Sequence, residues 1–317
     1  MSKSPPRVSF GLPVRNGQQT VRRCLESILA QDFQDFEVVV SDNASTDETR
    51  AILEEYAARD PRVRLFENPE NIGQIANVNR VFELSEGEYF RWIGSDDWLE
   101  PQYARRCVET LDNDRSAIAV TTYFRTHDDE GGSFYEEYQG ERLESERPEQ
   151  RFARMLWFFH GGDRKYDPLY SMMRREVLGR TALIRMMACA DWMLAAELSL
   201  LGRFLHVPEC LSHRRKPYET LSNRARHPTL MRRYHPTRYA ELPSSPGRLL
   251  GVLLSVIQSA ELTIAQRLIC LRAAVRFFLI ELYRRSCRYM HGFRRERLGL
   301  TRENLPFLRR NRQRRRL

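Results

Sequence analysis

Two adjacent carboxylates, Asp96 and Asp97, are the residues whose type and spacing point most directly to chemistry. They follow the apolar segment YFRWIG and precede Trp98-Leu99, which places them at the end of a buried segment. Adjacent carboxylates repel unless a cation neutralises them, and their oxygens suit hard ions such as Mg²⁺ or Mn²⁺. We therefore expect a divalent metal at this pair. The alternative is that one of the two caps the helix that begins after Pro101.

Three further polar clusters follow short apolar runs earlier in the chain. Ligands of open parallel sheets bind beyond the carboxyl ends of the strands, so clusters at successive strand ends would share one site. A single Asp after a strand is commonly a helix cap, but several such clusters on one edge indicate a binding site. The clusters are Pro13, Val14, Arg15 and Asn16 after the first run, Ser41-Asp42-Asn43 after the second, and 68–73 after the third.

The segments around these clusters alternate between strand and helix patterns. Strands joined through helices of this length predict a parallel, doubly wound sheet, and hence an α/β fold. The expected strands are 8–13, 36–40, 63–66, 89–93, 118–124 and 169–173. The expected helices are 20–30, 49–59, 77–85, 102–111, 151–159 and 191–201, with loops at 127–149 and 213–246.

Four segments together resemble the inverting, nucleotide-sugar-dependent glycosyltransferases of family 2, which have the GT-A fold. The likeness is specific across about residues 7–111 and weaker to about residue 215. It implies a mixed, mainly parallel sheet flanked by helices, with a C-terminal amphipathic helical extension here. The segments are VSFGLPVRNGQQTVRRCLESILAQ, FEVVVSDNASTDET, NPENIGQ and GEYFRWIGSDDWLEP.

The resemblance also implies roles for the strand-end residues. In this family the turn after the first strand (Pro13, Val14, Arg15 and Asn16) and the acid after the second (Asp42) hold the nucleotide base. A carboxylate can accept the N3–H of uracil or thymine. Asp96 is expected at the ribose or the metal, and Asp97 at the metal, where Mn²⁺ or Mg²⁺ offsets charge on the departing nucleoside diphosphate. Asn71 and Gly73 fall where the family closes over the donor.

Inverting transfer also needs a general base for the acceptor hydroxyl. The family places an Asp at the start of a helix, and Asp191 is the candidate here, although Ala190 stands where an acidic residue is usual. Asp191 could equally be a first-turn acid of its helix. Trp192 is expected either to stack on an acceptor sugar or to pack in the core.

Two features lie on the C-terminal side of the expected site. The QxxRW signature of processive members is absent, which favours a single transfer per encounter. His213-Arg214-Arg215-Lys216 is a basic cluster that could fold over the diphosphate, with His213 as the candidate donor contact. A solvated basic loop is the alternative.

The net charge of +9 is unevenly distributed. Residues 248–317 carry 17 Arg and 4 Glu, a net of +13, whereas the preceding residues carry a net of −4. From Leu249 onward the pattern is helical and amphipathic, with an apolar stripe that runs from Ile264 to Leu282. This tail could lie on an anionic membrane, pack on the catalytic domain, or join a second subunit as a homodimer. An acidic body without a nucleic-acid module argues against nucleic-acid binding.

The sequence thus predicts a catalytic domain at 1–240 and a basic helical tail at 241–317. Six cysteines without CxxC spacing and no apolar leader predict a cytoplasmic protein, at most peripheral on the inner membrane face. The expected partners are a nucleotide-sugar donor and a glycan or lipid-linked acceptor. A non-catalytic scaffold of the same fold is one alternative. A sugar nucleotidyltransferase is another, although 14–17 lacks that class's glycine-rich loop and lysine.

Overall fold

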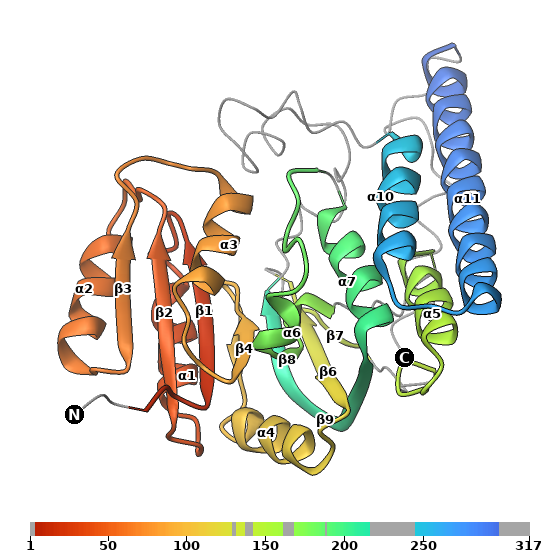
Figure 1. Cartoon of the computed structure of the whole chain (residues 1–317). Coiled ribbons are helices and arrows are strands. Elements are labelled where there is room, and N and C mark those ends of the chain that lie inside the picture. The colour runs from red at the N-terminus through yellow and green to blue at the C-terminus, as the bar shows by residue number, and fades with distance from the viewer. Residues whose placement is uncertain are drawn as a thin grey trace.

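A mixed sheet flanked by helices forms the body of the protein (Figure 1). The computed structural model describes residues 4–128, 131–136, 142–160, 168–187, 189–215 and 245–297. Within them, nine strands run in the order β3-β2-β1-β4-β8-β6-β9-β5, with β7 paired to β6. The strands are β1 Val8–Val14, β2 Phe36–Asp42, β3 Val63–Glu67, β4 Tyr89–Trp92, β5 Trp98–Leu99, β6 Ala117–His127, β7 Ser133–Glu136, β8 Met172–Arg174 and β9 Arg203–Arg215.

The helices cover both faces of this sheet. Alternate residues of a strand point to opposite faces, so Val38 and Val40 of β2 pack in one core and Val39 in the other. The first core includes α1, α2 and α4, and the second includes α3, α5, α7, α10 and α11. The helices are α1 Val21–Leu29, α2 Thr49–Arg59, α3 Gln74–Glu83, α4 Tyr103–Asn113, α5 Pro148–His160, α6 Arg175–Leu178, α7 Ala190–Leu201, α10 Pro246–Ser259 and α11 Ile264–Arg297, with a 3₁₀ turn at Pro168–Tyr170.

The first four strands are parallel, which confirms the fold class that the sequence predicts. The second half of the sheet is more mixed, because β8 runs antiparallel to both β4 and β6. The loop expected at 127–149 contains β7, which pairs with β6 as an edge strand. The first two residues of the strand expected at 169–173 lie in a 3₁₀ turn, and β8 begins at Met172.

The long strand β9 was not expected from the sequence. Its charged residues and Pro208 hide the alternation of apolar side chains, and bulges interrupt its parallel pairing with β6. The end of β9 also pairs with β5, where His213 lies opposite Trp98. This pairing brings the C-terminal end of β9 beside the loop that holds the two carboxylates.

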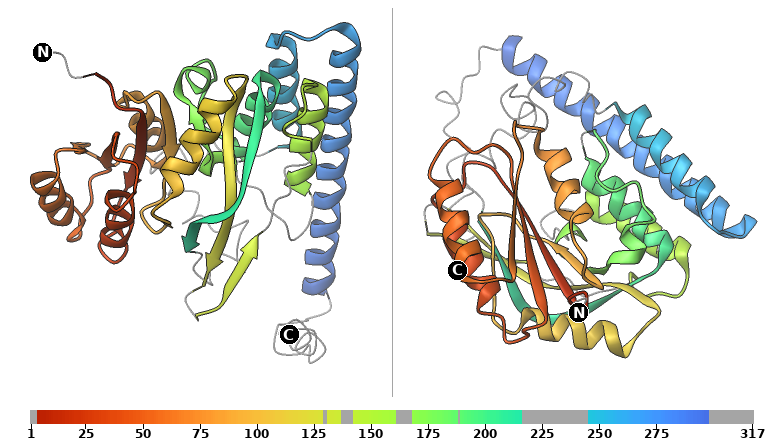
Figure 2. Two further views of the ribbon diagram at one scale, coloured as in Figure 1. Left: turned by 90° about the horizontal axis from the view of Figure 1, so that it is seen from below. Right: turned by 60° about the vertical axis from the view of Figure 1, so that its left-hand side comes forward.

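The C-terminal helices α10 and α11 form a hairpin that packs on the catalytic fold. Leu253 of α10 and Phe277 of α11 are buried in the same core as α5 and α7. Figures 1 and 2 place this hairpin at the opposite end of the molecule from α2. Of the arrangements expected for the C-terminal tail, the structure therefore shows the one in which the tail packs on the domain that contains the sheet. None of the described helices combines the length and hydrophobicity needed to span a bilayer.

Candidate active site

The carboxyl ends of β1, β2 and β3 meet at one edge of the sheet, at the top of Figure 1. The registers place Val14 beside Asp42, and Asp42 beside Glu67. The loops also join through the backbone: Asn43 N–H donates to the carbonyl of Val14 at 2.9 Å, and Asn68 N–H to that of Asp42 at 2.9 Å. The three polar clusters that follow these strands are therefore neighbours, as their position in the sequence predicts.

The turn after β1 is clamped to the loop after β2. Asn16 has a φ of 54°, in the left-handed region that Asn tolerates better than most residues. Its side-chain oxygen accepts from Thr46 N–H at 2.9 Å, and its own N–H donates to Ser45 Oγ at 2.9 Å. In this turn Pro13 is half-buried, Val14 is buried, and Arg15 and Asn16 are exposed.

Asp42 is the last residue of β2, at the start of the second of these loops, and is 3% exposed. Ser45 donates to its carboxylate through both N–H and Oγ. A carboxylate has about four lone-pair sites, so Asp42 keeps capacity to accept a further hydrogen bond. Its position suits a nucleobase N–H, but that role remains a prediction.

A network of buried amides holds the loop after β3. Asn43 Nδ2 donates to Asn71 Oδ1 at 2.9 Å, and Asn77 Oδ1 accepts from Asn68 Nδ2 at 2.8 Å. Gly73 N–H donates to Asn71 Oδ1, and Gly73 has a φ of 88°, which a side chain would strain. Asn71 and Gly73 thus shape this loop, and Asn43, Asn68 and Asn77, which the sequence analysis did not single out, support it.

Asp96 and Asp97 converge on the backbone of Gly94. A methyl group at Gly94 would lie 2.9 Å from both Asp96 Oδ1 and Asp97 Oδ2, so these oxygens are within about 6 Å of each other. The same loop approaches the turn after β1, because a side chain on Gly17 would lie 3.2 Å from Ser95 Oγ. The carboxylate pair therefore joins the same edge as Asp42.

The two carboxylates differ in environment. Asp96 is half-buried, whereas Asp97 is 4% exposed. The pKa of Asp97 is raised to about 7, chiefly by burial and also by the negative charge of Asp96, against the opposing positive charges of Arg214 and Arg91. The negative charge at Asp97 is therefore poorly solvated without a cation.

Arg91 and Arg214 are two basic residues at this site that the sequence analysis did not assign individually. Arg214 Nε lies 4.0 Å from Asp97 Oδ2, and the backbone N–H of Arg215 donates to Asp97 Oδ1 at 3.3 Å. Arg91, from β4, is 1% exposed and donates to Ser212 Oγ at 3.2 Å. Both arginines line a small cavity of about 20 Å³, large enough for one water molecule. A basic residue in the middle of an apolar strand pattern was the signal for Arg91.

The carboxylate pair fits a hard divalent cation. Two carboxylates are the usual protein share of a Mg²⁺ or Mn²⁺ site that also binds phosphate oxygens and water. Among the described residues, no group of three or more His, Cys, Asp or Glu side chains is placed to hold a metal ion by itself. A metal at Asp96 and Asp97 would thus depend on a ligand that supplies the remaining oxygens, as a diphosphate does.

His213 lies close to this loop but makes other contacts. Its Nε2 is 2.7 Å from Glu100 Oε1, and its Nδ1 is 3.1 Å from His127 Nε2. Its ring stacks on Trp98 at 5.1 Å, with the Arg23 guanidinium on Trp98 as well. Both ring nitrogens have partners, and the members of the basic cluster that lie at Asp97 are Arg214, through its side chain, and Arg215, through its backbone N–H. Lys216 lies outside the described residues.

Asp191 is in the first turn of α7, which begins on the side of the sheet toward which β1, β2 and β3 point (Figure 1). Cys189 precedes the helix with a φ of 59° and provides no side-chain cap. Asp191 is half-buried, and its role as general base remains a prediction. Trp192 stacks on Phe159 at 5.0 Å and contacts Phe277, so it packs in the core.

The fold and this edge define an α/β protein with polar and acidic residues gathered at the carboxyl ends of its parallel strands, and sequence comparison shows which family it belongs to. Residues 9–180 match the family model "Glycosyl transferase family 2", and the chain belongs to this family. The chain is 39% identical over 129 residues to a chondroitin synthase from Escherichia coli, which covers 41% of the chain and 19% of that protein. It is 31% identical over 129 residues to glycosyltransferase GlyA from Streptococcus pneumoniae serotype 4, covering 41% of the chain and 18% of GlyA.

A hyaluronan synthase from Pasteurella multocida is 30% identical over 143 residues, 44% of the chain and 15% of that protein. The matched region is thus less than a fifth of each of these three relatives. Among solved structures, Staphylococcus aureus TarS 1–349 in complex with UDP-GlcNAc superposes with a TM-score of 0.62 at 18% identity, over 86% of this chain and 72% of TarS 1–349. This likeness confirms the expected GT-A architecture.

Proposed function

We propose that the protein transfers a single sugar, with inversion, from a UDP- or dTDP-sugar to a hydroxyl of a glycan or lipid-linked acceptor. The observation that carries the proposal is the convergence of Asp42, Asp96 and Asp97 on one edge of the sheet, with Arg214 beside Asp97. Such an edge offers a hydrogen-bond acceptor for a base at one end and a cation site for a diphosphate at the other. The separation of Asp42 from the Asp96–Asp97 pair along this edge suits a nucleotide bound in an extended conformation.

On the donor side, each residue has a separate task. Asp42 accepts the N3–H of the pyrimidine, and the turn from Pro13 to Asn16 encloses the base. Asp96 and Asp97 hold Mn²⁺ or Mg²⁺, which offsets the charge on the departing nucleoside diphosphate when it is bound. Arg214 lies close enough to Asp97 to donate to the same diphosphate.

On the acceptor side, the Asp191 carboxylate takes the proton from the attacking hydroxyl. The acceptor oxygen forms a bond to the anomeric carbon as the bond from that carbon to the diphosphate oxygen breaks. The electron pair of the broken bond remains on the nucleoside diphosphate. Attack from the opposite side inverts the anomeric configuration, and a base of this kind contributes about 10²- to 10⁴-fold to the rate.

Two observations support a role in cell-envelope polysaccharide synthesis. The relatives include bacterial proteins named as chondroitin and hyaluronan synthases, which indicates a polysaccharide context. The absence of QxxRW favours one transfer per encounter over polymer synthesis. A lipid-linked acceptor would be met at the inner face of the cytoplasmic membrane, by the protein alone or as a homodimer.

The test combines binding and turnover in the full chain. UDP is titrated by calorimetry with and without Mn²⁺, and transfer is followed by product analysis with UDP- and dTDP-sugars and membrane-lipid acceptors. We expect Asp97→Ala to lose metal-dependent UDP binding, and Asp191→Asn to keep UDP binding while turnover falls by about 10²-fold or more. Asp32→Asn, in a surface ion pair with Arg105, is the matched control and should change neither. Full transfer by both site variants would refute the assignment.

A second candidate function rests on Ala190, which stands where the family usually has an acidic residue before the base. If Asp191 does not act as a base, the protein would be a nucleotide-sugar-binding scaffold of the same fold. The same experiment separates the two functions. The scaffold would show metal-linked UDP binding without transfer to any acceptor and without release of UDP from the donor.

A further inference from the structure

Helix α11 has two apolar faces, and the fold covers one of them. Cys270, Ala274 and Phe277 are fully or almost fully buried against the rest of the second core. Arg267 ties the start of α11 to α10, because its guanidinium donates to the carbonyls of Ile257, Gln258 and Ala260. The inner face is therefore used by the fold and fixes which face of α11 looks outward.

The opposite face exposes a continuous row of large apolar side chains. Steps of three, four and seven residues keep them on one side of the helix, away from Ala274 and Phe277. The exposed fraction is 82% for Ile264, 71% for Tyr283 and 56% for Leu279. Large apolar side chains exposed together on one face of a helix mark a surface that binds something outside the fold. The row consists of Ile264, Leu268, Val275, Leu279, Leu282 and Tyr283, here called the outer face.

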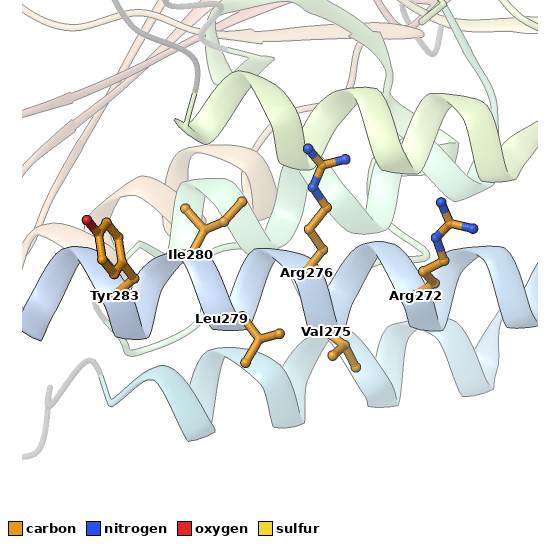
Figure 3. A pocket seen from close by; sticks show the side chains of 6 residues that line it. All are labelled: Arg272, Val275, Arg276, Leu279, Ile280 and Tyr283. Carbon is orange, nitrogen blue, oxygen red and sulfur yellow. The ribbon is translucent and has the colours of Figure 1, made fainter.

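Two arginines lie along one edge of this outer face. Arg272 and Arg276 are exposed, and with Val275, Leu279, Ile280 and Tyr283 they line a groove of about 440 Å³. Figure 3 shows the two guanidinium groups on one side of α11, with Val275 and Leu279 on the other. Glu281 is buried on the inner side. Among the side chains that the structure describes, the outer face thus combines a row of apolar residues with two exposed guanidinium groups along its edge.

We propose that the outer face of α11 is a membrane-docking surface that lies in the headgroup region of an anionic lipid bilayer. Apolar side chains can enter the boundary of the acyl chains while long arginine side chains extend to lipid phosphates. Tyr283, an aromatic side chain with a polar tip, suits the same depth. The bilayer supplies both an apolar phase and negative charge, so it complements each property of this surface.

The charge also decides against a second copy of the chain as the occupant. A two-fold interface places the same patch of both subunits face to face, so Arg272 and Arg276 of one copy would approach their own counterparts. Like charges at such a contact are repulsive, and among the described side chains of α11 no acid lies on this face to offset them, since Glu281 is buried on the other side. An anionic lipid surface would instead attract the guanidinium groups of Arg272 and Arg276.

The proposed surface deepens the proposed function, because it would bring the catalytic edge to lipid-linked acceptors. It rests on contacts that are independent of the donor site. α11 lies at the opposite end of the molecule from α2 (Figure 2), so lipid binding can be measured without sugar transfer. A failure of vesicle binding and a failure of catalysis are therefore distinguishable.

The experiment is flotation of the full chain with vesicles of phosphatidylcholine, alone or mixed with phosphatidylglycerol. We expect tight binding to the mixed vesicles that weakens with salt, and little binding to phosphatidylcholine alone. Leu279→Glu should weaken binding to mixed vesicles about tenfold or more, because it removes an exposed apolar side chain that would enter the bilayer and adds a charge of the same sign as the lipid. Arg272→Gln and Arg276→Gln should each weaken it about fivefold.

Leu201→Glu is the matched control. Leu201 is an apolar residue of α7 with an exposure of 42%, close to the 45% of Val275, and its substitution should leave vesicle binding unchanged. Circular dichroism and urea unfolding report that each variant is folded, independently of donor binding. Equal binding of wild type and Leu279→Glu would overturn the proposal and assign the attraction to other basic segments. Absence of vesicle binding, with a dimer in ultracentrifugation that Leu279→Glu dissociates, would overturn it in favour of self-association.

Discussion

Replacement of Asp97 by Asn should make the metal-free protein more stable above neutral pH, while it removes metal-dependent donor binding. Asp97 is 4% exposed, and burial together with the charge of Asp96 raises its pKa to about 7, against a reference value of 3.8. Asn has nearly the same shape but no charge to desolvate. A residue that is retained for function at a cost in stability should give a more stable protein, with impaired function, when it is replaced.

The magnitude follows from the two pKa values. Because the folded pKa lies above the unfolded value, the stability associated with the protonated group is complete below pH 3.8 and is lost as the pH rises to about 7. The whole shift corresponds to about 4 kcal/mol, and the part that falls between about pH 5 and about pH 8 to about 2–3 kcal/mol.

Urea unfolding of wild type and Asp97→Asn in a chelator, at about pH 5 and about pH 8, measures this difference. Groups that do not interact with Asp97 titrate alike in both proteins and cancel. We expect the variant to gain about 2–3 kcal/mol relative to wild type between the two pH values. Addition of Mn²⁺ with UDP at the higher pH should stabilise wild type and leave the variant unchanged.

The reasoning would be refuted by a difference between the two proteins that does not change with pH. Such a result would mean that Asp97 ionises without a desolvation penalty, so that its burial gives no reason for a cation. A gain for the variant at low pH, with none at high pH, would show the opposite sign and refute it equally.

Three further perturbations test other parts of the structure. Gly94→Ala should weaken Mn²⁺-dependent UDP binding about tenfold or more because its methyl group would displace both carboxylates, whereas Gly251→Ala, which meets no atom within 4 Å, should not change UDP affinity. Asn77→Ala should lower the urea unfolding free energy by about 1–3 kcal/mol, since it leaves buried partners unpaired; an unchanged midpoint would contradict the amide network. Phe277→Ala should lower the stability of the catalytic fold by about 3–5 kcal/mol in one transition, and a separate unfolding step for the hairpin would show that α10 and α11 are not part of its core.

Much of the first half of the fold could be predicted from the sequence. In β1 and β2, continuous apolar runs end in polar clusters, and this local pattern alone fixes strand, strand end and side of the sheet. The second half could not be predicted in the same way. β9 carries charges and a proline, and it is a strand because β6 and β5 pair with it, which is a non-local cause.

The candidate site shows the same division. Asp42, Asp96 and Asp97 are recognisable because each follows an apolar strand. The positions of Arg91 and Arg214 relative to Asp97 could not be inferred from the sequence. Arg91 lies inside β4, and Arg214 lies near the end of β9, a strand that the sequence pattern does not predict. The expectation that His213 contacts the donor stays a prediction, and in the structure its ring is paired with Glu100 and His127.

The sequence by itself determined that this protein has a parallel-strand edge with paired carboxylates and a basic, amphipathic tail. These follow from the period of apolar residues and from charge, which are local properties of the chain. The tertiary structure decided that Asp97 is buried beside two arginines and that one face of α11 is covered while the other is exposed. The burial and the electrostatic environment of a residue depend on what packs against it. Only the folded chain therefore decides which strand end forms the candidate site and which face of α11 is exposed.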